Sequence, residues 1–386
     1  MVRGRCAAGM ACLSGWVALG GCAASAPKAD PLTVGMEEHR RRFGEFELPR
    51  KVGSVVNIGV QLPTISPDGT QMLYLRSDLD VVSPMTLLGS GDPIDTPAEG
   101  TLSICLRPVA GTSPGQRITR ERWAHSPMWS PAGRFMVYVA AEAGGTSIVR
   151  LDPASGGRDV LVDNDGVNCL PTFDGDDGTL LYCHGQTAWG PFEVRRQRVA
   201  EGRPVALTPR GMDCLLPVLS DGGRQVICGR VDGGRVDWAL CTRESTTPIL
   251  PRFSPAQRPV PLQAWAGISV PVSPDRRGFL FYDMSQDRVA VCHWADRAVR
   301  RHRSGSIAAC WLANDAIALA TADALFAVNV NSGVSISLLT GSWIPLRYVA
   351  STSKLYLLAK DGTSATRLAV YELAFRPAVD LRSRLR

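Results

Sequence analysis

Cysteine is the residue type whose spacing in this sequence points most directly to chemistry. Cys169 and Cys183 are 14 residues apart, and Cys214 and Cys228 are also 14 residues apart, each pair starting in a Gly-x-x-Cys-Leu context. Each pair is centred on a short acidic, glycine-containing segment typical of a turn. Residues placed symmetrically about the turn of an antiparallel hairpin lie opposite each other, with Cα atoms about 4.5–5.5 Å apart, within disulfide range. We therefore predict the disulfides Cys169–Cys183 and Cys214–Cys228, and buried free thiols are the alternative.

The other cysteines of the chain body give no comparable pattern. Cys105, Cys241, Cys292 and Cys310 have no repeated spacing, so their pairing stays open. The chain has 11 cysteines in 386 residues, which favours either metal binding or an oxidising compartment. Because no Cys-x-x-Cys motif and no nearby set of histidines accompanies the cysteines, we predict no metal site.

The sequence offers little that could serve as catalytic machinery. Residues 111–115 match the G-x-S-x-G pattern of hydrolases, but they lie in a turn-like segment with no helix after it. The five histidines form no H-x-H or H-E-x-x-H pair, and no phosphate-binding loop is present. We therefore predict no catalytic residues and no cofactor.

The first residues have the pattern of a secretory signal. Arg3 and Arg5 precede the small and apolar residues 6–21, which carry no charge and are too few for a membrane span. The segment ends in Leu-Gly-Gly-Cys at residues 19–22, which resembles the lipobox of bacterial lipoproteins. The resemblance implies a signal peptide over residues 1–21 and a lipid on Cys22, which would hold the protein on a membrane.

The rest of the chain divides into a tether, a body and a tail. Residues 22–50 are expected to form the lipidated N-terminus and a polar tether, 51–376 the body, and 377–386 a C-terminal tail. Ala23 follows the lipobox cysteine, and by resemblance to Gram-negative lipoproteins this favours the outer membrane, facing the periplasm or the cell surface. The net charge of +6 is mild and unclustered, so we predict no nucleic-acid partner.

The body repeats one local pattern: a short apolar segment, a turn rich in Pro, Asp and Gly, and a second apolar segment. Proline presets φ, aspartate bonds the local backbone and glycine accepts a positive φ, so each copy predicts a β-hairpin. The clearest copies are 62–74, 126–138, 170–182, 216–228 and 270–282, and weaker copies begin near 309 and 346. Two further strand-like runs follow the hairpins.

Units of four strands predict an all-β fold, a β-propeller of four-stranded antiparallel blades. Seven copies favour seven blades, with six as the alternative. Residues 55–60 could supply the fourth strand of the last unit and so close the ring. The sequence Ser-Pro-Asp-Gly at 66–69, before a Tyr-ended strand, resembles the repeat of TolB-like propellers over roughly residues 55–376. The resemblance implies the fold and leaves the function open.

We therefore predict that the function of the chain depends on a binding surface. In propellers of this kind, residues that enter the innermost strands surround one mouth of the central channel, and here they include His125, Asn168, Asp213 and Ser269. We predict a non-catalytic envelope lipoprotein whose propeller is a scaffold for binding a protein, peptide or glycan. The alternatives are a propeller enzyme, a lyase or glycan hydrolase with its site at the channel, and an accessory lipoprotein of a larger complex.

Overall fold

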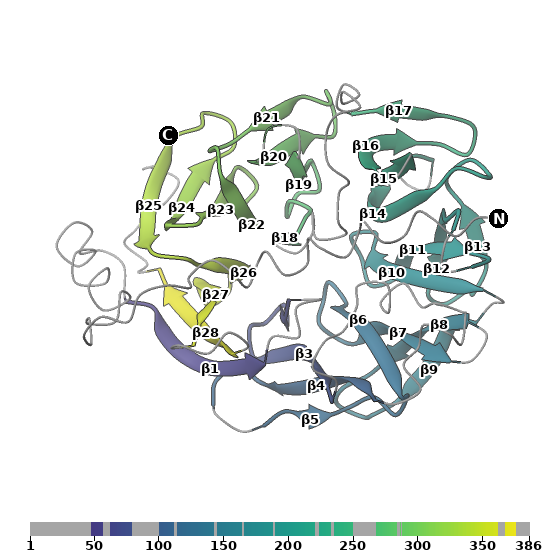
Figure 1. The fold of residues 1–386 in the computed structure, drawn as a ribbon, viewed down its shortest axis with the longest axis horizontal. Coiled ribbons are helices and arrows are strands. Elements are labelled where there is room, and N and C mark those ends of the chain that lie inside the picture. Colours follow the sequence, from purple (N-terminus) through teal and green to yellow (C-terminus); the bar gives the residue numbers. More distant parts are fainter. Residues whose placement is uncertain are drawn as a thin grey trace, which may run out of the picture.

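A computed structural model describes the arrangement of most of the chain body. The described residues are 48–56, 62–78, 100–111, 114–142, 145–163, 166–187, 190–220, 224–232, 235–249, 268–283, 286, 288–361 and 367–375. They contain strands and no helix, and the strands form sheets arranged in a ring around a common centre (Figure 1). Within the described part, no helix could therefore span a bilayer.

Consecutive strands form antiparallel groups that follow one another round the ring. The first three groups are β2 (Thr64–Ile65), β3 (Gln71–Ser77), β4 (Leu102–Pro108) and β5 (Gln116–Arg117); β6 (Trp123–Trp129), β7 (Met136–Glu142), β8 (Gly145–Leu151) and β9 (Arg158–Val162); and β10 (Val167–Phe173), β11 (Thr179–Gly185), β12 (Glu193–Arg198) and β13 (Pro204–Ala206). The fourth is β14 (Cys214–Ser220), β15 (Val226–Asp232), β16 (Arg235–Cys241) and β17 (Thr246–Pro248). The fifth is β19 (Gly278–Asp283), β20 (Arg288–His293) and β21 (Val299–Arg301), preceded by β18 (Ile268–Val270), which is hydrogen-bonded to the next group and not to β19. The last two are β22 (Ser306–Ala313), β23 (Ala316–Thr321), β24 (Ala324–Asn329) and β25 (Ser335–Thr340); and β26 (Ile344–Val349), β27 (Lys354–Lys360) and β28 (Arg367–Ala374), which β1 (Arg50–Val56) joins.

The predicted all-β propeller of antiparallel four-stranded sheets is confirmed. The third and fourth groups and the sheet β1-β28-β27-β26 each have four strands in simple antiparallel order. Two pairings depart from this order, because β18 pairs in parallel with β22 of the next group and β4 pairs in parallel with β6. Since these contacts join neighbouring groups into shared sheets, the count of seven blades stays a prediction.

The repeated turn has the construction that its sequence predicts. The Ser66 hydroxyl donates to Asp68 Oδ1 at 2.5 Å, and the same oxygen accepts the backbone amide two residues on at 3.0 Å. Gly69 has a φ of 76°, which glycine adopts without strain. In the fifth group Arg276 occupies the glycine position with a φ of 61°, and its guanidinium donates to Asp174 Oδ1 at 3.0 Å. This ion pair accompanies a backbone conformation that a non-glycine residue rarely adopts.

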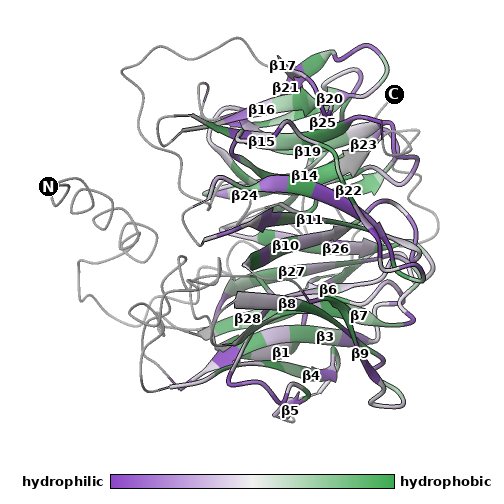
Figure 2. Ribbon diagram, turned by 90° about the vertical axis from the view of Figure 1, so that its right-hand side faces the viewer, coloured by the Kyte–Doolittle hydropathy of each residue, from purple (hydrophilic) through white to green (hydrophobic). Residues whose placement is uncertain are grey.

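The core lies between neighbouring sheets, and many of the strands carry hydrophobic stretches (Figure 2). Trp238 of β16 packs on Phe279 and Phe281 of β19, with ring centroids 6.0 and 5.9 Å apart. All three side chains are buried, and each such burial contributes about 1.5–3 kcal/mol. One apolar cluster extends through the third, fourth and fifth groups, so each sheet is held by the sheets on both sides.

The two ends of the described chain meet in one sheet. β1 pairs antiparallel with β28 over Arg50 to Val56, and the two strands lie side by side in Figure 1. The Glu372 carboxylate accepts hydrogen bonds from Arg50 Nε at 2.9 Å and Lys354 Nζ at 3.1 Å. Closure by an N-terminal strand is thus as predicted, but the strand begins at Arg50 rather than near residue 55, and residues 57–60 lie outside the described part.

Removing the closing strand should destabilise the whole ring. Deletion of residues 1–56 uncovers the edge of β28 and the partners of Val52 and Val55, which are 7% and 5% exposed. We expect the free energy of unfolding to fall by about 3–6 kcal/mol, the burial of two valines. Urea unfolding followed by tryptophan fluorescence measures this loss. Deletion of residues 1–47, which retains β1, is the matched control, and equal midpoints for the two deletions would contradict the closure.

Candidate functional site

A polar pocket of about 260 Å³ opens where the inner strands β10 and β14 begin. The end of β11 contributes residues 184–186, the segment leading into β12 contributes Pro191, Phe192, Glu193 and Arg195, and the segment before β14 contributes residues 210–212. The pocket therefore joins the third and fourth groups. It lies at the strand ends where the sequence placed the channel-mouth residues Asn168 and Asp213.

His184 lines this pocket, and Asn168 lies next to His184 in the sheet. They are paired across β10 and β11, and His184 Nδ1 lies 2.9 Å from Asn168 Oδ1. Because an amide oxygen only accepts, Nδ1 carries the hydrogen, and Nε2 is left as the acceptor that faces Gln186 Nε2 at 3.4 Å. Burial, together with the charge of Arg195, lowers the pKa of His184. The imidazole is therefore neutral near pH 7, with a lone pair at the pocket.

The side chain of Asn168 is fully committed to the fold. Its Nδ2 donates to the Thr146 carbonyl at 2.7 Å, its backbone amide donates to Thr146 Oγ1 at 2.6 Å, and it is 0% exposed. Asn168 therefore positions His184 and cannot itself contact a ligand from solvent. Asp213 is half-buried and its Oδ1 accepts the Phe192 amide at 3.0 Å, so it fixes the segment that forms one wall. Burial raises the pKa of Asp213.

The charges of the pocket are unequal. Glu193 and Arg195 form an ion pair, with Arg195 Nε donating to Glu193 Oε1 at 2.6 Å. Arg210 is exposed, and no described residue pairs with it. With His184 neutral, the lining has one uncompensated positive charge. Such a site can accept an anionic group, and arginine binds carboxylates in a two-pronged geometry.

None of the three predicted mouth residues whose side chains are described lines this pocket directly: Asn168 and Asp213 only contact residues that do, and His125 lies apart from it. His125 is 0% exposed, its Nδ1 lies 3.0 Å from Ser126 Oγ, and its Nε2 has no partner among the described residues. Burial lowers the pKa of His125 to about 3. Ser269 lies in β18, but its side chain falls outside the described part.

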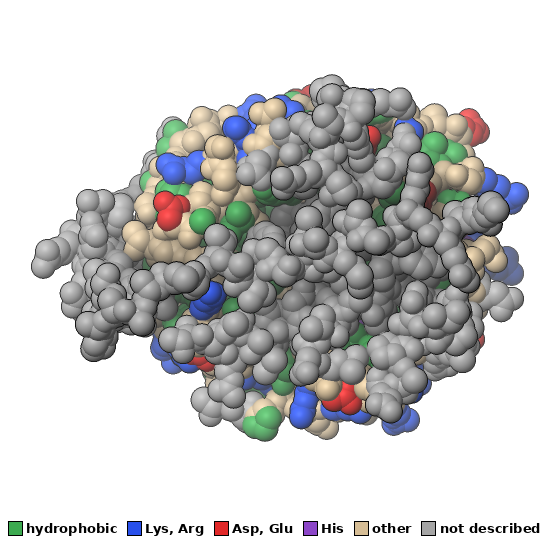
Figure 3. Space-filling view, in the orientation of Figure 1, with side chains coloured by type: hydrophobic (Ala, Val, Ile, Leu, Met, Phe, Trp, Pro, Cys, Tyr) green, Lys and Arg blue, Asp and Glu red, His purple; other side chains and the backbone are tan. Residues whose placement is uncertain are grey.

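Sequence reasoning did not identify His184, Glu193, Arg195 or Arg210. For His184 a signal was present, because the symmetry that places Cys169 opposite Cys183 also places Asn168 opposite His184, as observed. The arginines had no such signal, since they come from a third strand and from a segment of the next group. Other basic and acidic side chains are scattered around the rim of the face shown in Figure 3.

The predicted disulfide partners lie in two different arrangements. Cys169 and Cys183 are opposite each other as expected, whereas β14 pairs Cys214 with Arg230, so the expected register of Cys214 with Cys228 is wrong. The register is already displaced at the turn end of this hairpin, where Leu219 is opposite Ile227, and the shift between Leu215 and Leu219 does not bring Cys214 back to Cys228. All four sulfurs are free thiols in this structure, as are those of Cys105, Cys241, Cys292 and Cys310. The Cys169–Cys183 disulfide stays a prediction, whereas the facing geometry on which the Cys214–Cys228 disulfide was predicted is not found.

Several predicted features fall outside the described residues. They are the signal peptide over 1–21, the lipid site at Cys22, most of the tether over 22–50, and the tail over 377–386. Ser113 of the hydrolase-like pattern is also outside, although Gly115 is described and its amide donates to Tyr74 Oη at 3.1 Å.

Comparison with known proteins supports the fold. No family model and no curated protein sequence matches this chain. Oligogalacturonate lyase from Vibrio parahaemolyticus has a TM-score of 0.52 at 10% identity, covering 85% of this chain and 91% of that one. The propeller domain of the Trilobed protease from Pyrococcus furiosus, described as having an open velcro topology, has a TM-score of 0.51 at 11% identity, covering 83% and 96%. TolB from Acinetobacter baumannii has a TM-score of 0.39 at 14% identity, covering 80% of this chain and 66% of TolB's own length.

The burial of His125 predicts a specific pH dependence of stability. Its folded pKa of about 3 lies below the ordinary 6.5, so between these values the unfolded chain binds more protons and stability falls as the pH is lowered. We expect His125→Leu to remove up to about 1.4 kcal/mol per pH unit of this loss. Urea unfolding at several pH values from 7.5 to 4 measures it. Above pH 7 the histidine is neutral in both states, so a difference between the proteins there is pH-independent, and parallel profiles below pH 6.5 would contradict the prediction.

Proposed function

We propose that this chain is a lipid-anchored protein of the bacterial envelope whose propeller binds an acidic group of a protein, peptide or glycan at the channel-mouth face. The observation that carries the proposal is the polar pocket between the third and fourth groups, with Arg210 exposed at it and His184 held neutral. A ligand carboxylate could pair with Arg210 while a ligand hydroxyl or amide replaces the side chain of Gln186 as the donor to His184 Nε2.

The pocket is built to keep its shape. Asn168 fixes the ring of His184, and Asp213 fixes the backbone of Phe192. The amide of Cys214 also donates to the Phe192 carbonyl at 2.8 Å, which ties the wall to the next inner strand. A rigid site loses little conformational entropy when a ligand binds, which favours a binding role.

The anchoring part of the proposal rests on the N-terminal sequence alone. In it, residues 1–21 are removed, Cys22 carries the lipid, 22–50 form the tether, 51–376 form the propeller and 377–386 the tail. The tether would let the propeller reach partners near the outer membrane, on its periplasmic side or at the cell surface. Acyl chains contribute about 0.8 kcal/mol per buried CH₂, so the lipid supplies the membrane affinity.

An enzyme on the same ring is the second candidate, because solved structures with this fold include a lyase and a protease domain. Fold likeness at 10–11% identity does not choose between a binding protein and an enzyme. Turnover of a purified acidic glycan or peptide by the isolated protein, abolished by His184→Gln, would replace the binding proposal.

Reversing the charge of Arg210 should abolish ligand capture. We expect immobilised protein to retain an envelope component that Arg210→Glu retains at least about 10-fold less, because one charge-assisted pair contributes about 1.5–3 kcal/mol. Quantitative mass spectrometry of the eluates measures this. Arg203→Glu is the matched control, because Arg203 is exposed at the turn between β12 and β13, at the opposite ends of these strands. Equal recovery by both variants would contradict the pocket.

The lipid anchor is tested separately. Cys22→Ser should abolish incorporation of a labelled fatty acid and release the protein from the membrane fraction, because the acceptor sulfur is lost. Metabolic labelling in a Gram-negative host measures this, and Cys12→Ser is the control, since that cysteine would leave with the signal peptide. Undiminished labelling of Cys22→Ser would show that the lipid is attached at another residue and would contradict the prediction.

A further inference from the structure

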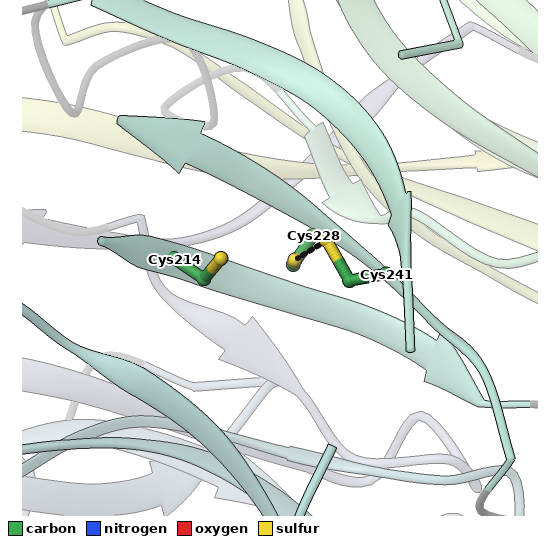
Figure 4. Close-up of side chains that lie close together, drawn as sticks. All are labelled: Cys214, Cys228 and Cys241. Carbon is green, nitrogen blue, oxygen red and sulfur yellow. Dashed lines mark hydrogen bonds between the residues drawn. The ribbon is translucent and has the colours of Figure 1, made fainter. Parts of the chain in front are cut away.

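Three cysteine side chains from three adjacent strands meet inside the fourth group (Figure 4). Cys214 lies on β14, Cys228 on β15 and Cys241 on β16, and each is 0% exposed. The three sulfur atoms all lie within 4.8 Å of one another, and those of Cys228 and Cys241 are 3.4 Å apart. We refer to these residues as the cysteine trio.

The strand register puts the trio on one face of the sheet. Arg230 of β15 is opposite Cys214, and Val226 of β15 is opposite Cys241. Cys228 is two residues from Arg230 and two residues from Val226 along β15. Because side chains alternate along a strand and opposite residues share a face, the three cysteine side chains point to the same side of the sheet. The other face of β16 carries Trp238, which packs toward the fifth group. The trio therefore belongs to the side that faces the third group, within their shared apolar cluster.

The same register disfavours a disulfide within the trio. Cys214 and Cys228 are diagonal neighbours rather than opposite residues, and so are Cys228 and Cys241. Diagonal neighbours are about 7–8 Å apart, whereas a disulfide does not bridge Cα atoms more than about 7 Å apart without backbone movement. The sulfurs can converge, but forming a bond between any two of them would require the strands to move.

We propose that the cysteine trio binds one Cu(I) ion through its three sulfur atoms. Metal–thiolate bonds of about 2.3 Å around a three-coordinate ion place the sulfurs about 4 Å apart. This spacing is between the 3.4 Å of the nearest pair and the 4.8 Å limit of the trio. Thiolate ligands select soft ions such as Cu(I). Structural Zn²⁺ takes four ligands, and the described residues supply no fourth His, Cys, Asp or Glu atom to this group.

The surroundings suit a buried thiolate site. Arg230, opposite Cys214 in the sheet, adds a positive charge close to Cys241, which offsets part of the negative charge of the thiolates. Because the sulfurs are closed to solvent, the ion enters as the chain folds, and its binding energy adds to the stability of the fold. Thiol protons pass to solvent as the Cu–S bonds form, and the copper stays in the Cu(I) state throughout.

The test uses the full chain refolded anaerobically with a thiol-free reductant and Cu(I), followed by dialysis against a Cu(I) chelator. We expect about one copper to be retained, and X-ray absorption to give three sulfurs at about 2.3 Å. Cys214→Ser, Cys228→Ser and Cys241→Ser should each retain at least about 10-fold less copper, because three sulfurs bind the ion together. Cys310→Ser, which removes a buried thiol of β22, is the matched control and should retain it.

Three results would overturn the proposal. One is a wild-type protein that keeps no copper while its thiols remain titratable. Another is copper with fewer than three sulfur neighbours, a measurement that needs no variant to fold. The third is a disulfide within the trio, found by peptide mapping of protein isolated from the envelope. Circular dichroism of the serine variants separates loss of the ion from loss of the fold.

Discussion

The ring depends on one pairing, in which a strand from the other end of the chain body completes the last sheet. β28 has no later described strand to pair with, so its outer edge is satisfied only by β1 from the other end of the body. This pairing brings Arg50 to Glu372 and buries Val52 and Val55 against β26 and its neighbours. Because every sheet packs on two others, the closure holds the complete ring rather than one sheet.

Much of the fold could be predicted because its information is local. Ser66, Asp68 and Gly69 make their own hydrogen bonds and dihedral angles, so the turn can be recognised in isolation. The parallel pairing of β18 with β22 could not be predicted in this way, since it depends on how two sheets approach each other. Arg276 at a glycine position also has its partner, Asp174, about 100 residues away in the sequence.

The candidate site also has one part that local sequence could predict and one part that it could not. Asn168 and His184 are related by one hairpin, and the hairpin symmetry that was used for the cysteines applies to them as well. Glu193, Arg195 and Arg210 reach the pocket from a third strand and from the neighbouring group. Their convergence depends on Asp213 holding the backbone of Phe192, a contact between groups that no spacing in the sequence records.

The cysteines show how a difference in hairpin register changes the chemistry of a repeated unit. Leu170 and Leu216 both precede a proline and both have positive φ, so each inner strand bulges at the same place. In β10 the shift between Cys169 and Thr172 brings Cys169 opposite Cys183, whereas in β14 the hairpin starts with Leu219 opposite Ile227, and its shift still leaves Cys214 opposite Arg230. The same spacing thus gives a facing pair in one sheet and a diagonal one in the next, where Cys241 completes a group of three. Because the amide of Cys214 also donates to the Phe192 carbonyl, the cysteine trio and the pocket wall are joined at the start of β14.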